Sequence, residues 1–551
     1  MRIKGVNKSF PLIIALCFAG GVILGYYLTI NTLNNGGRKG DSSNKLDLLM
    51  DVIHREYVDS LSDSSIIEKA IPHILAELDP HSRYIPSKDV EAVNKELEGT
   101  FSGIGVIFIL KEDTITVTEV VAGGPSSKAG ILKGDRIVRI NDSLYAGTNL
   151  KQTEVMKRLR GKKDSKVKLG IKRRNLEELK YVTVTRGDIP VSSVNVSYKV
   201  SDDIGYIKIA QFGSNTYQDF LLAIAKLKKQ HCNSFIIDLR DNPGGFLDAT
   251  INMVNEFLPA GKLIVYTEGK AYPRNESYSN GEGSCQHSPV VVLIDEISAS
   301  ASEIFAGAIQ DNDRGLIIGR RSFGKGLVQS QPSFSDGSAI RLTIARYYTP
   351  TGRCIQKPYK PGQEAEYEDE VYQRYLHGEF SSQDSIKQND SLRFKTPSGR
   401  IVYGGGGITP DIFVPLDSMG WTSYSKAVIT KGLIPMFAFN YVEAHAEQLK
   451  DFKHYWPLLE YLNELDLLSE FVDYAETKGV NRRPYLIDTS KNMLDTYIKA
   501  FIGQYLLSDE AYYPIIFQLD ATYKRAVHEM KLKSNPILMM SPQPINKNEQ
   551  R

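Results

Sequence analysis

A serine-rich segment at residues 298–302 lies between a continuous apolar run and a helical pattern, and its middle serine is Ser300. A serine at such a junction has its hydroxyl beside helical N–H groups, where developing negative charge is stabilised. The same serines can serve only as helix caps. The segment alone therefore leaves a nucleophile and a cap as alternatives.

A second segment contains Lys325 between two glycines and amid apolar residues. A serine nucleophile needs a base, and lysine qualifies only when it is neutral near pH 7. The ordinary lysine pKa of about 10.4 would have to fall by about three pH units, roughly 4 kcal/mol, which burial can supply. Gln329 lies four residues further on and is placed to orient the amine by a hydrogen bond. A structural or phosphate-binding turn explains Lys325 alone equally well.

Three other catalytic or nucleotide-binding interpretations fit these residues less well. Residues 319–325 match the start of a P-loop, but Gly326 occupies the place of the Ser or Thr that holds Mg²⁺. Two Ser-x-x-Lys matches lack the Ser-Asp-Asn and Lys-Thr-Gly of penicillin-binding enzymes. Of the histidines, His81 and His231 lie nearest the motif regions, and nothing ties either to Ser300 in a Ser/His/Asp triad.

The elements around these residues alternate between strand and helix patterns over residues 186–357, which predicts an α/β layered core. Residues 361–390 are polar and mildly acidic and are expected to form a surface insertion, and the α/β core is expected to span 186–416. Residues 417–551 are helical in character. They are expected either to pack on the core or to dock partners or dimerise.

A glycine-rich pattern at residues 98–185 resembles a PDZ domain, above all in residues 124–141. In that family a loop of the type Gly103, Ile104, Gly105 and Val106 offers backbone N–H groups to the terminal carboxylate of a peptide. Glycines suit this role because they leave the amides open to an anion. The resemblance implies that this loop binds peptide tails.

The charge pattern gives no reason to expect a nucleic-acid partner, because the formal net charge is only +2. Within the basic stretch at residues 161–174, apolar residues alternate with lysines. This predicts a half-exposed strand whose lysines protect a sheet edge.

The N-terminal segment predicts a membrane anchor. Residues 10–30 are uncharged and apolar and follow three basic residues, so they are long enough to span a bilayer with residues 1–9 in the cytoplasm. Residues 31–43 are expected to be a tether and residues 44–97 a helical region. The chain would then be a single-pass inner-membrane protein with its catalytic part in the periplasm. A cleaved signal peptide is the alternative.

Length and cysteine content set further limits. A chain of 551 residues is expected to form three or four units. Cys232, Cys285 and Cys354 follow the expected anchor and provide neither a disulfide framework nor metal-ligand spacing, although one bridge remains open.

Taken together, the motifs resemble those of the carboxyl-terminal processing proteases over residues 44–415. Lys325 follows Ser300 by twenty-five residues, and Gln329 follows four later. The other matching motifs are residues 79–84, 238–245 and 346–353. The resemblance implies a multidomain α/β protein with a ClpP/crotonase-like protease core, an inserted PDZ-like domain, and helical regions before and after them.

The resemblance also assigns roles to residues. Ser300 would be the nucleophile, Lys325 the base, and Gln329 its support. The oxyanion hole would use the N–H of Ala301 and one from the Pro-Gly-Gly turn, Gly244 or Gly245; the sequence does not say which glycine.

The implied function is a serine endopeptidase that cleaves near C-terminal tails through an acyl-enzyme. It would need no metal or organic cofactor, and the PDZ-like domain would present unstructured C-terminal tails of protein or peptide substrates. A homo-oligomer or an adaptor protein remains open. The alternative from another class is a non-catalytic PDZ scaffold at the membrane.

Overall fold

The computed structural model describes residues 20–21, 43–111, 114–147, 150–173, 176–417, 419–532 and 536–539. It divides into two units, residues 1–74 and residues 75–551. The first unit contains helix α2 (Ser43–Glu56) and most of helix α3 (Asp63–Ala76). The candidate site lies in the second unit.

The expected single-pass membrane location is corrected by the structure. No helix in the described ranges is both long and apolar enough to cross a membrane. The longest, α16 (Pro484–Leu507), is interrupted by charged residues, including Asp488 and Lys491. Of the segment 10–30, all but Gly20 and Gly21 lie outside the described residues.

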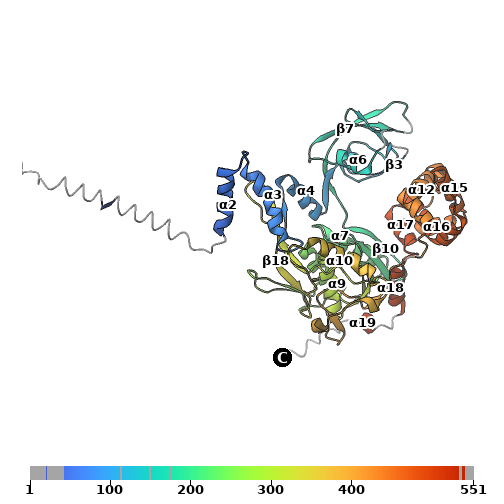
Figure 1. Ribbon diagram of the computed structural model, residues 1–551. Helices are drawn as coiled ribbons and strands as arrows, with labels where there is room; N and C mark the ends of the chain where they lie inside the picture. Colours follow the sequence, from blue (N-terminus) through green and yellow to red (C-terminus); the bar gives the residue numbers. More distant parts are fainter. Residues whose placement is uncertain are drawn as a thin grey trace, which may run out of the picture. The chain divides into compact units, whose positions relative to one another are not determined.

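The core of the second unit is a six-stranded sheet in the order β10-β11-β12-β15-β16-β21. Figure 1 shows its first strand, β10, beside helix α7 (Thr216–Lys229). Only the β10–β11 pair is antiparallel. The strands are β10 (Val194–Lys199), β11 (Ile204–Ile209), β12 (Ser234–Asp238), β15 (Val290–Ile294), β16 (Leu316–Gly319) and β21 (Ile412–Phe413). The central strands β12 and β15 are buried at every residue, as expected for parallel strands covered on both faces.

Helices cover both faces of this sheet. Alternate residues such as Ile237 and Val292 pack with α7 (Thr216–Lys229), α8 (Leu247–Asn255) and α9 (Ala301–Asp311). The residues between them, such as Ile236 and Val291, pack with the C-terminal helices of the chain. Those helices are α17 (Asp509–Ile516), α18 (Ala521–Leu532) and α19 (Pro536–Met539). The end of the described chain thus completes a three-layer α/β core.

A second sheet places strands from distant parts of the sequence side by side. Its order is β1-β18-β13-β14, with β17 also paired to β18. The strands are β1 (Arg83–Ile85), β13 (Leu263–Glu268), β14 (Asn275–Tyr278), β17 (Leu327–Ser330) and β18 (Ala339–Tyr348). Helix α4 (Ser87–Glu98) follows β1, and a hairpin of β19 (Arg393–Lys395) and β20 (Ile401–Tyr403) lies further along.

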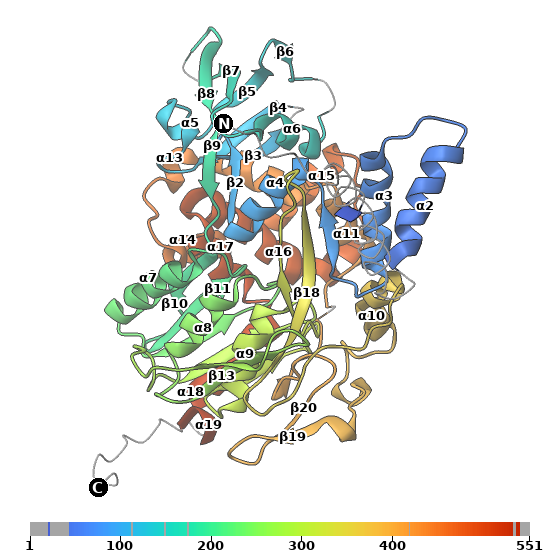
Figure 2. The ribbon, with the colours of Figure 1, turned by 90° about the vertical axis from the view of Figure 1, so that its left-hand side faces the viewer.

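The glycine-rich region folds as a separate sheet in the order β3-β4-β5-β7-β8, with β6 paired to β5. Its elements are β3 (Val106–Lys111), β4 (Thr114–Val120), α5 (Pro125–Lys128), β5 (Arg136–Ile140), β6 (Ser143–Leu144), α6 (Gln152–Leu159), β7 (Lys166–Lys172) and β8 (Lys180–Thr185). The antiparallel pair β2 (Thr100–Gly103) and β9 (Gly187–Pro190) carries the chain into and out of it (Figure 2).

The predicted lysine-lined edge strand is only half right. In β7 the apolar residues are buried and Lys166 and Lys168 are exposed, as the alternation predicts. However, β7 pairs with both β5 and β8, so it is an interior strand and β8 forms the edge. The pattern reports which face is buried, whereas the position in the sheet depends on pairing with a later segment.

Residues 361–390 are more than a surface insertion. They contain α10 (Glu364–Leu376), whose Tyr367 and Arg374 are buried. Tyr367 contacts His81, and Arg374 donates to the carbonyl of Ser322. The helix therefore supports the loop that precedes Lys325.

The remaining helices form their own apolar cluster. They are α11 (Ser423–Thr430), α12 (Leu433–Ala444), α13 (Ala446–Leu449), α14 (Tyr455–Asn463), α15 (Leu467–Thr477) and α16. The three cysteines of the described region, Cys232, Cys285 and Cys354, are free thiols.

Candidate active site

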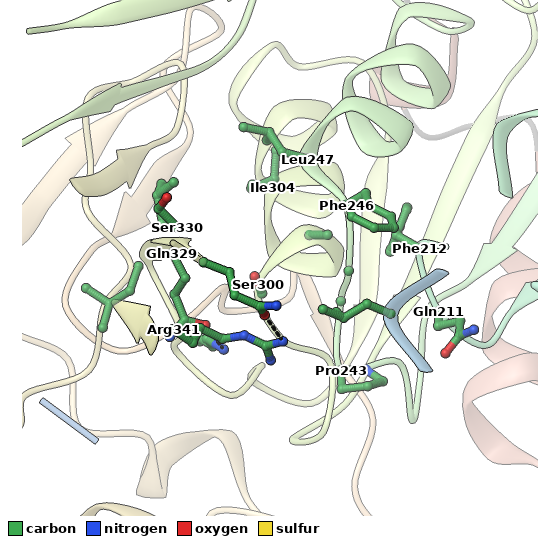
Figure 3. Close-up of a pocket in the computed structure, with 18 of the residues that line it drawn as sticks. Gln211, Phe212, Pro243, Phe246, Leu247, Ser300, Ile304, Gln329, Ser330 and Arg341 are labelled. Atoms are coloured by element: carbon green, nitrogen blue, oxygen red, sulfur yellow. Dashed lines mark hydrogen bonds between the residues drawn. The ribbon is translucent and has the colours of Figure 1, made fainter. Parts of the chain in front are cut away.

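A cleft of about 720 Å³ brings together the residues that the sequence singled out (Figure 3). Its lining includes Ser300, Lys325 and Gln329. It also includes the three candidate oxyanion-hole residues, Gly244, Gly245 and Ala301. The PDZ loop residues 103–106 are not part of this lining; they run from the end of β2 to the start of β3.

Ser300 lies at a sharp turn between β15 and the start of α9. Its backbone has φ 54° and ψ −112°, which is unusual for a residue with a side chain. Such strained conformations recur at strand-to-helix turns that expose a nucleophile. Two neighbouring serines hold the turn, since Ser298 Oγ donates to the Leu239 carbonyl at 2.8 Å and Ser302 Oγ to the Asn242 carbonyl at 2.9 Å.

The Pro-Gly-Gly turn packs directly against this serine. A Cβ on Gly244 would lie 2.8 Å from the Cβ of Ser300, and one on Gly245 would lie 2.1 Å from the Phe212 carbonyl oxygen. The Gly244 N–H is already used, because it donates to Asn242 Oδ1 at 2.9 Å. None of the hydrogen bonds of the described residues uses the N–H of Gly245 or Ala301. Two unused amides therefore remain beside Ser300.

Lys325 is held in a mostly buried setting. Its Nζ donates to Gln329 Oε1 at 3.3 Å. Burial lowers its pKa to about 8, and repulsion from Arg341 and Arg83 acts in the same direction. The amine thus needs little further help to be neutral near physiological pH.

Glu303 joins the serine turn to the lysine loop. Its fully buried carboxylate accepts from the Ser300 N–H and the Lys325 N–H, each at 2.8 Å. It also accepts from the Gly324 N–H at 2.7 Å and from Ser322 Oγ at 2.6 Å. Burial raises the pKa of this carboxyl to about 7. One carboxylate therefore fixes the two backbones relative to each other.

A tyrosine makes a second connection between the same two backbones. The Tyr347 hydroxyl lies 3.1 Å from the Ser300 carbonyl oxygen and also contacts the Lys325 carbonyl oxygen. The ring is buried, and burial raises the pKa of the phenol far above its ordinary value, so the hydroxyl stays a donor. Neither side of the site can shift without breaking these contacts.

The support of Lys325 extends to the segment before β1. Gln329 Nε2 donates to the His81 carbonyl at 2.7 Å. That carbonyl is fixed by Asp79, which accepts from the His81 N–H at 2.9 Å and from Thr343 Oγ1 at 3.0 Å. His81 itself bonds to Tyr367 through Nε2, and burial lowers its pKa to about 4. The histidine therefore acts through its backbone.

Sequence reasoning named the serine, the lysine and the glutamine but missed their supports. Glu303 lies three residues after Ser300, which is the spacing of a capping box and was a usable signal. Tyr347 lies inside the motif at 346–353 without a role having been assigned to it. Nothing local indicated the contact from Gln329 to the His81 carbonyl, because 248 residues separate them.

Comparisons with known proteins agree with this architecture. Residues 203–365 match the family described as Peptidase family S41, and residues 102–185 match the PDZ domain. A carboxy-terminal-processing protease of Bartonella bacilliformis is 34% identical over 348 residues, which are 62% of this chain and 79% of that protein. The chain belongs to peptidase family S41. The predictions of a serine-type peptidase and of a multidomain α/β fold with a PDZ domain are confirmed.

Two further proteins are similar to this chain. A probable CtpA-like serine protease of Staphylococcus aureus is 34% identical over 340 residues, 61% of this chain and 67% of that protein. The solved photosystem II D1 C-terminal processing protease is 26% identical, with a TM-score of 0.36. The match covers 67% of this chain and 86% of the chain of that protease. Residues 424–508 match a family of unknown function, DUF8443, which coincides with the separate helical cluster α11–α16.

Proposed function

We propose that this S41 peptidase is an endopeptidase with a Ser300/Lys325 dyad that cleaves proteins near their C-terminal tails. The observation that carries the proposal is the joint placement of a strained serine and a mostly buried lysine of lowered pKa in one cleft. Neither residue alone excludes a structural role. Together they would supply a nucleophile and a base that is mostly neutral above pH 8.

The proposed chemistry is acyl transfer. Neutral Lys325 removes the proton from Ser300 Oγ as this oxygen attacks the carbonyl carbon of the scissile peptide. The tetrahedral intermediate collapses, the C–N bond breaks, and the lysinium gives its proton to the leaving amine. A water molecule, deprotonated by the same lysine, then cleaves the acyl ester and restores Ser300. Gln329 keeps the amine oriented during these steps.

The oxyanion of the intermediate would be bound by the N–H groups of Gly245 and Ala301. Gly245 is preferred over Gly244 because the Gly244 N–H already donates to Asn242. The N–H of Ala301 is at the first turn of α9, where helical amides have no intrahelical acceptor and the helix dipole favours negative charge. Removing one such donor usually lowers kcat by about 10²–10³.

The PDZ domain would recognise the tail of the substrate. Strand β3 is the first strand of its sheet and pairs with β4 on one side, which leaves its other edge for an added strand. Ile104, Val155 and Leu159 belong to one buried apolar cluster, so the loop before β3 and helix α6 are packed together. Gly105 takes φ 75°, the left-handed conformation that suits a loop whose amides face an anion.

The experiment compares the wild-type protein with Ser300→Ala on a peptide that has an unstructured apolar C-terminus. We expect the wild-type protein to cleave the peptide and to accumulate an ester-linked acyl-enzyme on rapid acid quench, seen as a mass increase on the peptide containing Ser300. Ser300→Ala should bind the peptide with unchanged Kd and give neither product nor adduct.

Two outcomes would contradict the proposal. Full-rate cleavage by Ser300→Ala would remove the serine from the mechanism. Tail binding without cleavage by the wild-type protein would instead favour a PDZ scaffold.

A further inference from the structure

Two arginines face each other at the side of the cleft. Arg83 in β1 and Arg341 in β18 are directly opposed partners in an antiparallel pair. Both line the cleft together with Ser300 and Lys325. Like charges placed directly opposite each other destabilise an antiparallel pair. An anion bound to both guanidinium groups would remove this repulsion.

The hydrogen-bonding capacity of the pair is largely unused. No ion pair among the described residues includes Arg83 or Arg341. Arg341 donates once to a neutral acceptor, Gln331 Oε1, at 2.8 Å, and Gln331 is in turn fixed by donating to Asn94 at 2.7 Å. A guanidinium carries five N–H donors in a planar fork that fits a carboxylate. Most of these donors therefore remain available to a ligand.

The acidic residues that line the same cleft are not counter-ions of these two arginines. Glu96 lines the cleft and favours the charged form of Arg341, but in the described chain it forms no ion pair with either arginine. Asp248 also lines the cleft, and in the described chain it forms no ion pair with either arginine. The cationic side of the cleft thus lacks a built-in counter-ion.

The position of the pair relative to Ser300 identifies which part of a substrate would reach it. In Figure 3, Gln329 and Arg341 lie on one side of Ser300, and Pro243 and Phe246 lie on the other. Both arginines lower the pKa of Lys325, so they lie near its amine. The group that protonates the leaving amine must lie on the side of the leaving fragment. That fragment is the C-terminal part of the substrate.

We propose that Arg83 and Arg341 form a carboxylate-binding subsite for the leaving, C-terminal fragment of the substrate. This inference rests on the proposed Ser300/Lys325 mechanism, because the sidedness follows from the role of Lys325. The site is distinct from the PDZ loop, which joins β2 to β3 and does not line this cleft. It would fix how far from the bound carboxylate the peptide is cut.

Two sources offer the required chemistry. One is the α-carboxylate at the end of a short leaving fragment, and the other is an Asp or Glu side chain within a longer one. Both present two coplanar oxygens to the guanidinium forks, so the subsite binds either. The test distinguishes the two sources by placing the carboxylate either on a side chain within the fragment or at the end of the chain.

The experiment uses the full chain and two peptide series built on one cleavable sequence. In the first series every peptide ends in an amide, and a single Glu or Gln is moved through the leaving-side positions. In the second series the peptide is truncated so that its last residue falls at each of these positions, as a free acid or an amide. The measured quantity is the ratio of kcat/KM between the charged and the neutral member of each pair.

We expect a preference of about tenfold for the carboxylate at one leaving-side position, as a charge-assisted bidentate contact gives. Arg341→Gln should reduce this ratio to about one. Loss of its positive charge should also raise the pKa of Lys325, but that change affects both members of each peptide pair equally and cancels in the ratio. Arg83→Glu should reduce the ratio in the same way, because the introduced carboxylate would face Arg341 and occupy the subsite. Arg83 is exposed, so this variant tests the site at little risk to folding.

Arg346→Gln is the matched control. Arg346 lies on the same strand β18, is exposed, and is absent from the cleft lining, so its removal should leave the ratio unchanged. An effect confined to the first series assigns the ligand to acidic side chains. An effect confined to the second series assigns it to the chain terminus. Either supports the subsite.

The inference is overturned if no leaving-side position prefers a carboxylate, or if the preference survives both arginine substitutions. Its failure is separable from failure of the dyad. If Ser300→Ala abolishes cleavage but the arginine substitutions leave the kcat/KM ratio unchanged, only the subsite proposal is wrong. If Ser300→Ala cleaves normally, the mechanism beneath it is wrong as well.

Discussion

Two lysines, the mostly buried Lys325 and the fully buried Lys357, lie in adjacent loops but have opposite surroundings. Lys357 is 2% exposed, and its Nζ donates to Glu370 and to the Tyr367 carbonyl, each at 2.9 Å. It also lies over two aromatic rings, at 4.0 Å from the centroid of Phe323 and 4.2 Å from that of Tyr367. Lys325 has the neutral acceptor Gln329 and two nearby arginines instead.

The comparison shows that burial alone does not decide what a lysine does. Burial lowers the pKa of both side chains, but Glu370 opposes the effect at Lys357. Near Lys325 the strongest charge effects come from cations, so they add to the effect of burial. A carboxylate partner suits Lys357 to the role of a structural cation, whereas a neutral partner among cations suits Lys325 to the proposed role of a base.

The largest expected effect is the loss of activity in Lys325→Met, which keeps the length of the side chain but removes the amine. We expect kcat/KM to fall by at least about 10³, as for removal of a combined nucleophile activator and proton donor. Lys325→Arg should be equally inactive because a guanidinium does not deprotonate in this pH range. Peptide cleavage is followed by mass spectrometry, with folding checked by circular dichroism.

In the same assay, Lys357→Met should cleave the peptide as fast per folded molecule as the wild-type protein does. If Lys357→Met were as inactive per folded molecule as Lys325→Met, the distinction between base and structural cation would be lost.

A smaller loss is expected from Glu303→Gln, which alters the link between the two halves of the site. An amide has one acceptor oxygen where the carboxylate has two, and its NH₂ would face N–H donors. We expect kcat to fall by about 10² through misplacement of the serine and lysine backbones. The negative charge of Glu303 raises the pKa of Lys325, so its removal should also move the acidic limb of the kcat/KM profile to lower pH.

Glu256→Gln is the matched control for this variant. Glu256 is also buried and accepts from Tyr217 Oη at 2.8 Å and from the Ser284 N–H at 2.7 Å, but it does not line the cleft. Both variants should lose stability, and only Glu303→Gln should lose turnover per folded molecule. Equal turnover in the two variants would reduce Glu303 to a packing role.

The smallest effect concerns the free energy of unfolding. The folded-state pKa of Lys325 is about 8 against an ordinary 10.5, so the unfolded chain binds more protons between these values. The stability contributed by this residue is therefore lowest below pH 8 and recovers as pH rises through 10.5. Lys325→Met should raise the free energy of unfolding at pH 7 by about 2 kcal/mol and lose this advantage near pH 10.5.

Lys357→Met should instead lower the free energy of unfolding by about 2 kcal/mol, because it leaves Glu370 without its buried partner. Urea denaturation of both variants at pH 7 measures the contrast. The same sign of change in both variants would mean that the two lysines do not differ as described.

Ser300, Lys325 and Gln329 could be singled out from the sequence, whereas most of the residues that hold them in place could not, and the reason is physical. Ser300 and Lys325 are recognisable because glycine, apolar and helix-start patterns around them are local. The contact between Gln329 and the His81 carbonyl depends on folding of distant segments, and no periodicity encodes it. The choice between Gly244 and Gly245 depends on which N–H the Asn242 side chain already occupies.

The fold shows the same division between local pattern and long-range contact. Continuous apolar strands indicated a covered α/β sheet, and the sheet is covered on both faces. That one face is covered by helices α17–α19 could not be inferred, because helices that pack on a sheet and helices that pack on each other share one apolar pattern. The placement of β7 inside its sheet was missed for a similar reason.

The central claim is tested most directly by the pH dependence of kcat/KM for a C-terminal tail peptide, measured from pH 6 to 10. This profile reports the pKa of the free enzyme's essential groups. The account predicts a rise with a midpoint near the Lys325 pKa of about 8 and a plateau above it. A rate that is flat across this range, or that rises with a midpoint near 6.5 as for a histidine base, would contradict it.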